Sequence, residues 1–172
     1  CTFIGNSAGE GSKKKAKAYS LIGIGINLVQ TAFILLFLIL ERENVSYFYT
    51  NEESVRTVFL NLMYIFYFGL FFDVGANTLS FILRSLGQEQ FALNSSLFSF
   101  YVVGLGCQVI LAFGLDLSYY GIWIGLLLGF FSMVFFSVYK LYKLDWDGEI
   151  KKIKAQMNKK QAVEMEPLAP EV

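Results

Sequence analysis

One acidic residue, Asp73, lies in the middle of a long apolar stretch, FGLFFDVGANTLSFIL. An ionised carboxylate inside a bilayer costs about 2.5–3.5 kcal/mol on insertion scales, so it is retained where it faces a bundle interior or a water-filled cavity. Asn77 and Ser80 follow at i+4 and i+7, on the same helical stripe. Together these side chains could exchange a proton or bind a cation. The alternative interpretation is that Asp73 only pairs with a neighbouring helix.

Two other apolar stretches carry polar residues at helical spacing. One contains Asn27 and Gln30, and the other contains Asn94, Tyr101 and Gln108. Such residues either line a polar cavity or form hydrogen bonds between helices. We predict that they line a cavity, and the packing interpretation remains open for each of them.

Three glycines, Gly121, Gly125 and Gly129, recur at four-residue spacing in the last apolar stretch. This small-xxx-small pattern lets a second transmembrane helix approach closely. We therefore predict that these glycines serve helix packing and not chemistry.

The elements that must position these residues are four apolar segments. The chain has 172 residues, of which 55% are hydrophobic and 16% charged, with a mean hydropathy of +0.52. A bilayer-spanning helix needs about 20 apolar residues. Four continuous apolar runs meet that length, and they cover residues 18–40, 55–83, 91–115 and 119–141. The sequence predicts an all-α, polytopic transmembrane bundle and excludes a soluble or disordered chain.

The composition also argues against an enzyme. The chain has no histidine, which is the commonest general acid or base and a common metal ligand. Its two cysteines, Cys1 and Cys107, are far apart and form no CxxC motif. The sequence contains no nucleophile–base pair, no cluster of metal ligands, no cofactor-binding loop and no nucleic-acid-binding motif. The sequence predicts no enzymatic activity, no cofactor beyond a coupling ion, and no nucleic-acid partner.

The basic residues predict the orientation. Twelve of the 14 lysines and arginines lie before the first span, between the second and third, or at and beyond the end of the fourth. The other two, Arg42 and Arg56, flank the loop between the first and second spans. Because basic loops stay cytoplasmic, both chain ends should be cytoplasmic. We expect residues 1–17 to form a Gly/Lys-rich loop and residues 144–172 a polar tail. This tail could form a charged helix, but a solvated tail is the favoured interpretation.

Four segments resemble motifs of the multidrug and toxic compound extrusion (MATE) transporters. FIGNSAGEGSKKKAKAYS resembles that family's VGNxLGAGxxxxAK loop, and FFDVGANTLSFILRSLGQEQ resembles its DGxQxxLSGxxRGxGxQ stretch. FALNSSLFSFYVVGLG resembles AxxNLxxYYxxGLP, and YYGIWIGLLLG resembles the GxGxWxGLxxG opening of the last helix. The central Asp73 is in register. The chain departs from the family motifs at four positions, which affect substrate contacts and local helix geometry. These positions are Ala76, Phe81, Ser85 and Gly106.

This resemblance implies a position within a larger protein. Family members have twelve helices in two lobes, and the matching segments are helices nine to twelve. The chain would then be a fragment, a partial gene model or a truncated paralogue, and its partners would be the missing N-terminal helices, the bilayer and small organic substrates.

The resemblance also implies an activity. The intact protein would be an antiporter that exports organic, often cationic, compounds in exchange for H⁺ or Na⁺, with an acidic residue of the second lobe at the position of Asp73. One alternative is a non-transporting structural tetraspan subunit. A small oligomeric four-helix exporter ranks last, because the first span here has no acidic residue.

Overall fold

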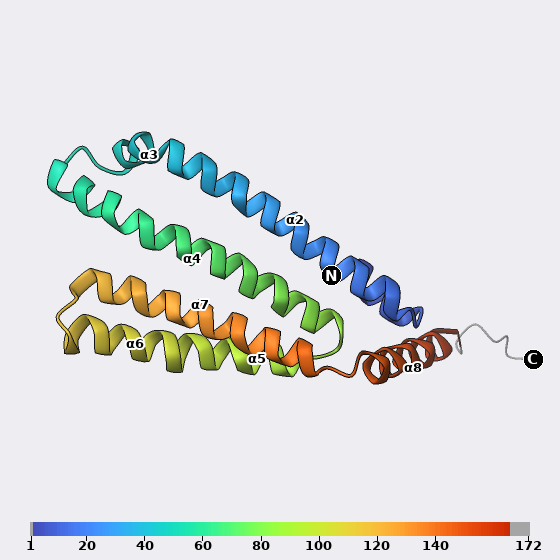
Figure 1. The fold of residues 1–172 in the computed structure, drawn as a ribbon. Coiled ribbons are helices and arrows are strands. Elements are labelled where there is room, and N and C mark those ends of the chain that lie inside the picture. The colour runs from blue at the N-terminus through green and yellow to red at the C-terminus, as the bar shows by residue number, and fades with distance from the viewer. Residues whose placement is uncertain (1, 166–172) are drawn as a thin grey trace, which may run out of the picture.

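A computed structural model describes residues 2–165, with side-chain surroundings up to residue 159. Helices make up nearly all of this part of the chain (Figure 1). Their bounds are α1 Thr2–Gly9, α2 Lys13–Leu40, α3 Arg42–Tyr49, α4 Glu53–Ser85, α5 Glu89–Leu97, η1 Phe98–Gly104, α6 Leu105–Val109, η2 Ile110–Gly114, α7 Ser118–Lys143 and α8 Trp146–Met165.

Four of the described helical segments are long and apolar enough to cross a membrane, which confirms the predicted bundle. They are α2, α4, the continuous run from α5 through η2 (residues 89–114), and α7. Large apolar side chains cover their outer surfaces, and Phe33 and Phe113, for example, are 73% and 79% exposed. In water such surfaces would be strongly unfavourable, whereas lipid tails solvate them.

The third span differs from the others in its helical winding. It passes from α5 into the π-helical segment η1, then through α6 into a second π-helical segment, η2. π-Helical turns bond i to i+5 and are therefore wider than α-helical turns. A search for 3.6-residue periodicity does not detect this change, and the sequence therefore predicted a uniform helix here.

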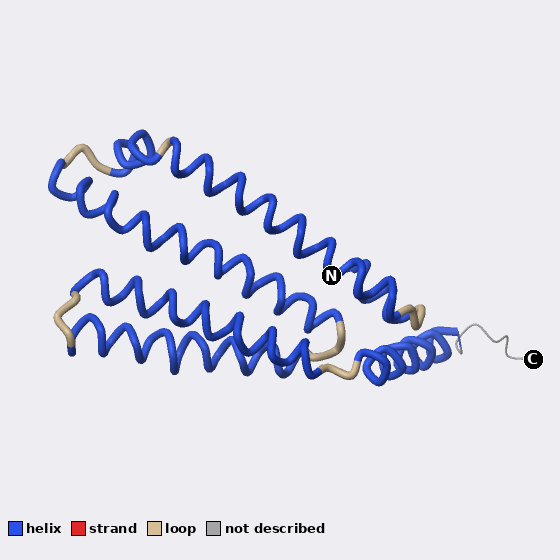
Figure 2. The backbone as a smooth tube through the Cα atoms, in the orientation of Figure 1, coloured by secondary structure: helices blue, strands red, loops and turns tan. Residues whose placement is uncertain are grey.

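Across the bundle the spans lie in the order α2, α4, α7 and the run from α5 through η2, so the fourth span lies between the second and the third (Figure 2). In the described part of the chain, α2 packs on α4, α4 packs on α7, and α7 packs along the whole third span. Phe72 of α4 meets Phe131 of α7 edge to face, with ring centroids 5.6 Å apart. Of the four spans, α2 contacts only α4.

Both polar ends of the chain are more ordered than the sequence predicted. Residues 1–17 were expected to form a loop, but they contain helix α1 and the first turn of α2. The tail was expected to be solvated, but Trp146–Met165 forms α8. The reason is mutual burial: Ala8 of α1, Ala16 of α2 and Ile150 of α8 form one apolar cluster. Residues 166–172 of the expected tail, with Pro167 and Pro170, lie outside the described residues.

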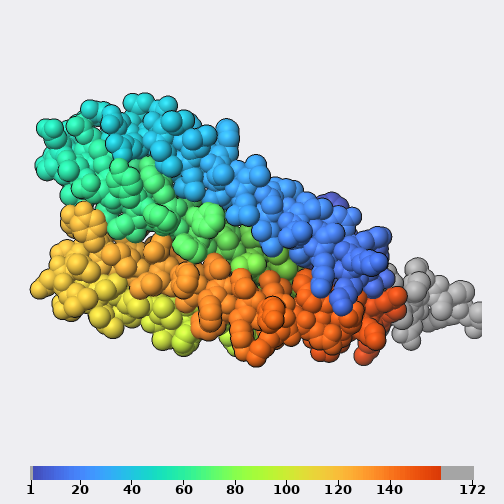
Figure 3. All heavy atoms as spheres, in the orientation of Figure 1, coloured from blue at the N-terminus to red at the C-terminus, as the bar shows by residue number. Residues whose placement is uncertain are grey.

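Helix α8 lies across the end of the bundle, next to α1 and the start of α2. Lys13 forms an ion pair with Asp147, and Lys17 Nζ lies 5.2 Å from the ring centroid of Trp146. In the space-filling view, the side chains at the start of α2 meet those of α8 at this end (Figure 3). The two predicted polar ends of the chain therefore form one structural unit.

Candidate functional site

Asp73 lies in the middle of α4 and has a hydrogen-bond partner on its own helix. The side-chain amide of Asn77 donates to Asp73 Oδ1 at 2.7 Å and to the Asp73 carbonyl oxygen at 3.0 Å. Asp73 is half-buried and Asn77 is exposed. The pair therefore forms an accessible polar site on a helix whose other surroundings are mostly apolar.

No basic side chain neutralises this carboxylate in the described part of the chain. The ion pairs found there involve Glu10, Glu53, Asp147 and Glu149. Arg84, on the same stripe, is eleven residues away, about 16 Å along the helix axis, and its guanidinium lies over the ring of Phe81. Asp73 is thus a carboxylate that a proton or a mobile cation can neutralise.

Ser80 lies on the same stripe but deeper in the protein. Its side chain is 2% exposed, and its hydroxyl has no hydrogen-bond partner among the described residues. A buried hydroxyl without a partner costs free energy, so such a group calls for an explanation. An approaching water or cation would supply a partner for its oxygen.

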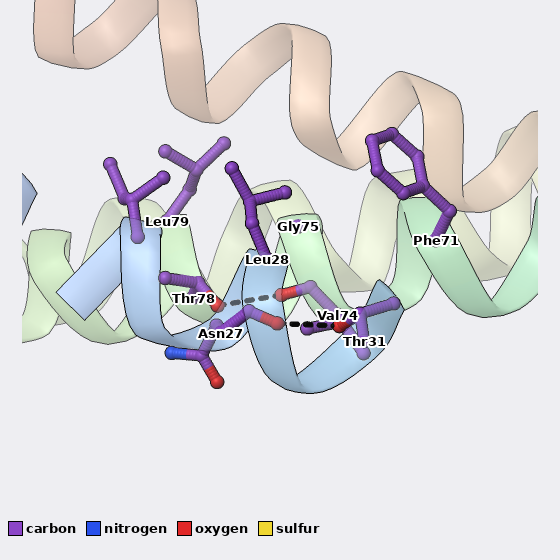
Figure 4. Close-up of a pocket in the computed structure, with 9 residues that line it drawn as sticks. Asn27, Leu28, Thr31, Phe71, Val74, Gly75, Thr78 and Leu79 are labelled. Atoms are coloured by element: carbon purple, nitrogen blue, oxygen red, sulfur yellow. Dashed lines mark hydrogen bonds between the residues drawn. The ribbon is translucent and has the colours of Figure 1, made fainter. Parts of the chain in front are cut away.

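Asn27 lines a groove of about 100 Å³ between α2 and α4, and Asp73 is not part of its lining (Figure 4). The polar groups of this groove are bonded to their own helices: Asn27 donates to the carbonyl of Gly23, Thr31 to that of Asn27, and Thr78 to that of Val74. Because these donors are already used, the groove is lined by an essentially apolar surface.

The other predicted cavity residues lie on separate surfaces. Gln30 is exposed on α2, and Tyr101 is 67% exposed on the third span. Asn94 is exposed and accepts a hydrogen bond from Gln90, whereas Gln108 is half-buried. The described part of the chain does not bring these residues into one pocket with Asp73, and their role stays a prediction.

The three glycines of α7 lie against the third span. A Cβ on Gly125 would be 2.5 Å from the backbone nitrogen of Gln108, and one on Gly121 would be 2.5 Å from that of Ala112. A Cβ on Gly129 would be 3.2 Å from Cα of Gly104. The main chains of the two spans therefore touch along this line.

Sequence reasoning missed a second pocket, of about 270 Å³, at the opposite end of the bundle from α8. Its lining includes Tyr49 of α3, Phe66 of α4 and Trp123 of α7. Phe66 and Trp123 meet edge to face with ring centroids 6.1 Å apart. The aromatic residues near the ends of these spans gave a signal, which the sequence analysis did not connect with a pocket.

A cation at Asp73 would be held by few ligands. Among the described residues, no group of three His, Cys, Asp or Glu side chains could hold a metal ion. One carboxylate with amide, hydroxyl and carbonyl oxygens is a hard-oxygen set, which suits a proton, Na⁺ or an organic cation better than a transition metal.

Comparison with known proteins gives a consistent result. The MatE family model matches residues 1–110. The chain is 26% identical over 147 residues to Multidrug and toxin extrusion protein 1 of Danio rerio, covering 83% of this chain and 24% of that protein. It is 28% identical over 150 residues to Protein DETOXIFICATION 20 of Arabidopsis thaliana, covering 86% of this chain and 30% of that protein. The chain thus spans about a quarter to a third of these relatives.

The fold is also similar to a solved structure. The eukaryotic MATE transporter AtDTX14 superposes with a TM-score of 0.83 at 21% identity, over 90% of this chain and 35% of that one. Together with the four apolar helices, this likeness identifies an integral membrane protein. Because the family model covers more than half of its residues, the chain belongs to the MatE family of multidrug and toxic compound extrusion transporters.

Proposed function

We propose that the chain supplies four helices to a secondary antiporter that exports organic, often cationic, compounds in exchange for H⁺ or Na⁺. Family membership supports this proposal, and so do the names of the relatives. Since the chain spans only part of those relatives, its partners are the remaining helices of such a transporter and the surrounding bilayer. Both ends of the chain are cytoplasmic in this proposal, in line with the distribution of lysines.

Asp73 is the proposed coupling group, and the observation that carries the assignment is its bond from Asn77 in mid-span. Within the four spans it is the one acidic residue away from a helix end, since Glu53 and Glu89 stand at the first residues of α4 and α5. A single carboxylate can hold either a coupling cation or a cationic substrate. Because the two compete, binding of one favours release of the other, and this difference drives alternating access.

Asn77 and Ser80 are the proposed helpers. An amide has both a donor and an acceptor, so Asn77 can donate to the free carboxylate and turn its oxygen toward a bound cation. The hydroxyl of Ser80, on the same stripe two turns later, is buried without a partner among the described residues, and we assign it a supporting role at this site. These roles require no cofactor other than the coupling ion.

The test is gradient-driven export by the complete transporter in proteoliposomes, with Asp73→Asn and a matched control, Asp116→Asn. Both substitutions remove one carboxylate, but Asp116 lies between the third and fourth spans. Its φ of 53° suits asparagine as well as aspartate. We expect Asp73→Asn to abolish export and Asp116→Asn to preserve it, and Asp73→Glu to retain part of it.

Applying a pH gradient and a Na⁺ gradient separately identifies the coupling ion. Undiminished export by Asp73→Asn would overturn the assignment of Asp73. Absence of export by the unsubstituted protein in either gradient would favour the non-transporting structural subunit instead.

A further inference from the structure

A cluster of lysines lies where α8 meets the start of α2. We define the lysine cluster as Lys13, Lys17, Lys151 and Lys154. The ion pair between Lys13 and Asp147 lies at its centre, and Lys17 lies over Trp146. The cluster therefore joins two segments that are more than 120 residues apart in the sequence.

The charges of Lys13, Lys17 and Lys151 act on the same carboxylate. The hydrogen bond from Lys13 is the main cause that lowers the pKa of Asp147, and the positive charges of Lys13, Lys151 and Lys17 lower this pKa further. One negative charge is thus surrounded by three positive ones, which leaves an excess of positive charge at this point.

Lys154 extends the cluster along α8 to the turn between α1 and α2. Gly11 has a φ of +83°, and a Cβ placed on it would be 3.1 Å from Cδ and 3.3 Å from Nζ of Lys154. The ammonium group therefore lies directly over the turn. No ion pair of Lys154 is found in the described part of the chain.

Two other acidic side chains nearby pair with other lysines. Glu10 pairs with Lys15 at 3.1 Å, and Glu149 pairs with Lys152 at 2.9 Å. The carboxylate of Asp145 accepts the backbone N–H of Asp147 at 3.2 Å and so belongs to the surroundings of the cluster. Four lysines against Asp145 and Asp147 leave the lysine cluster an excess of about two positive charges.

The cluster also lies at the polar end of the first span. The apolar part of the first span follows directly after Lys17, and Tyr19 comes two residues later. Tyr19 is 39% exposed and Phe3 of α1 is 72% exposed, and their ring centroids are 5.8 Å apart. Exposed aromatic side chains of this kind are typical of the interface between water and hydrocarbon.

We propose that the lysine cluster binds the headgroup of an anionic phospholipid. The excess positive charge would hold the phosphate, and the exposed Phe3 and Tyr19 would contact the adjoining acyl chains. A soluble anion would gain nothing from these aromatic side chains, so a lipid is the better fit. This proposal does not depend on transport or on Asp73.

The two tryptophans of the chain give a local measurement, since they report on opposite ends of the bundle. In the full chain with Trp123→Phe, Trp146 beside the lysine cluster is the sole tryptophan. In the reverse variant, Trp146→Phe, only the distant Trp123 remains. Both variants are reconstituted in phosphatidylcholine bilayers containing brominated phosphatidylglycerol or brominated phosphatidylcholine, and fluorescence quenching gives the relative affinity of the two lipids.

We expect Trp146 to show a preference of more than tenfold for phosphatidylglycerol and Trp123 to show none. Lysines near an anionic surface contribute about 1 kcal/mol each, so each of Lys151→Gln and Lys154→Gln should lower the preference roughly fivefold. Lys152→Gln is the matched control, because it removes the same charge from a neighbouring lysine that already pairs with Glu149. The Lys152→Gln variant should keep the full preference for phosphatidylglycerol.

Three results would overturn the proposal. The first is equal quenching of Trp146 by the two lipids in the chain with its lysines intact. The second is a loss of lipid preference in Lys152→Gln as large as in Lys151→Gln and Lys154→Gln. That result would show that the preference depends only on the total positive charge at this end of the bundle. The third is removal of the preference by inorganic phosphate but not by sodium chloride of the same ionic strength, which would indicate a site for a soluble anion.

Discussion

The side-chain amide of Asn77 donates a hydrogen bond of 2.7 Å to the carboxylate of Asp73, one helical turn earlier in α4. In the described part of the chain it is the one side-chain hydrogen bond to this carboxylate. A hydrogen bond to a charged group contributes about 1.5–3 kcal/mol. This bond therefore fixes the orientation of Asp73 in its free state.

We expect Asn77→Ala to lower export by the complete transporter about tenfold or more, because the carboxylate loses this orienting bond. Transport in proteoliposomes measures the effect. Asn44→Ala is the control, since Asn44 bonds to Glu41 at 2.6 Å in α3, outside the four spans. Equal activity of the Asn77 variant and the unsubstituted protein would exclude a role for this amide.

Replacing Ser80 separates its proposed function from its packing. The hydroxyl is buried without a partner, so Ser80→Ala should leave the protein at least as stable, with a gain of about 1 kcal/mol at most. Export should nevertheless fall if the hydroxyl supports the site at Asp73. Thermal unfolding and transport are measured on the same preparation, and unchanged export with raised stability would assign Ser80 to packing alone.

The contact between α7 and the third span predicts a strong effect of a single methyl group. A Cβ on Gly125 would lie 2.5 Å from backbone atoms of Gln108, and backbone cannot move aside easily. We expect Gly125→Ala to destabilise the bundle by about 1–3 kcal/mol, as overpacking does. The control is Gly25→Ala on α2, where nothing lies within 4 Å. Thermal unfolding in detergent should show a lower midpoint for the first variant only.

The docking of α8 should depend on pH through Asp147. The hydrogen bond from Lys13 lowers the pKa of the Asp147 carboxyl in the folded protein. The ion pair therefore stabilises the folded protein fully at pH values above the unfolded-state pKa of about 3.9. This stabilisation is lost as the pH falls through the lower pKa of the folded protein. In the Trp123→Phe background, the emission of Trp146 should therefore be constant from neutral pH to about pH 4 and shift to longer wavelength below it.

Two variants test this assignment. Asp147→Asn should remove the acid-induced shift, whereas Asp145→Asn should keep it, because Asp145 accepts the backbone N–H of Asp147 and the ion pair of Lys13 is with Asp147. A shift of the same size in Asp147→Asn would assign the acid transition to another group.

The sequence predicted the four spans because each is a long, uninterrupted apolar run. It also placed Asp73 and Asn77 on one face, since residues at i and i+4 are neighbours on a helix. It did not predict the π-helical segments η1 and η2 of the third span, because an uninterrupted apolar run has the same composition whether it is wound as an α-helix or as a π-helix.

Helix α8 was the less favoured of two interpretations of the tail because its charged residues concealed a weaker apolar pattern. Trp146, Ile150, Ile153 and Met157 are spaced by four, three and four residues, which is the spacing of a buried helical face. Ile150 is 4% exposed in the structure, although α8 as a whole is polar. The apolar surface that buries Ile150 comes from α1 and α2, at the other end of the sequence. The residues of the tail alone therefore do not show what α8 packs against.

The glycine line of α7 also has a mechanical consequence. Where side chains separate two helices, a change of rotamer can absorb a small displacement between them. At Gly121, Gly125 and Gly129 the main chains are in direct contact, and no rotamer is available to do so. The spacing between these two helices is therefore set by van der Waals contact between backbone atoms, and we expect the two helices to move together as one body.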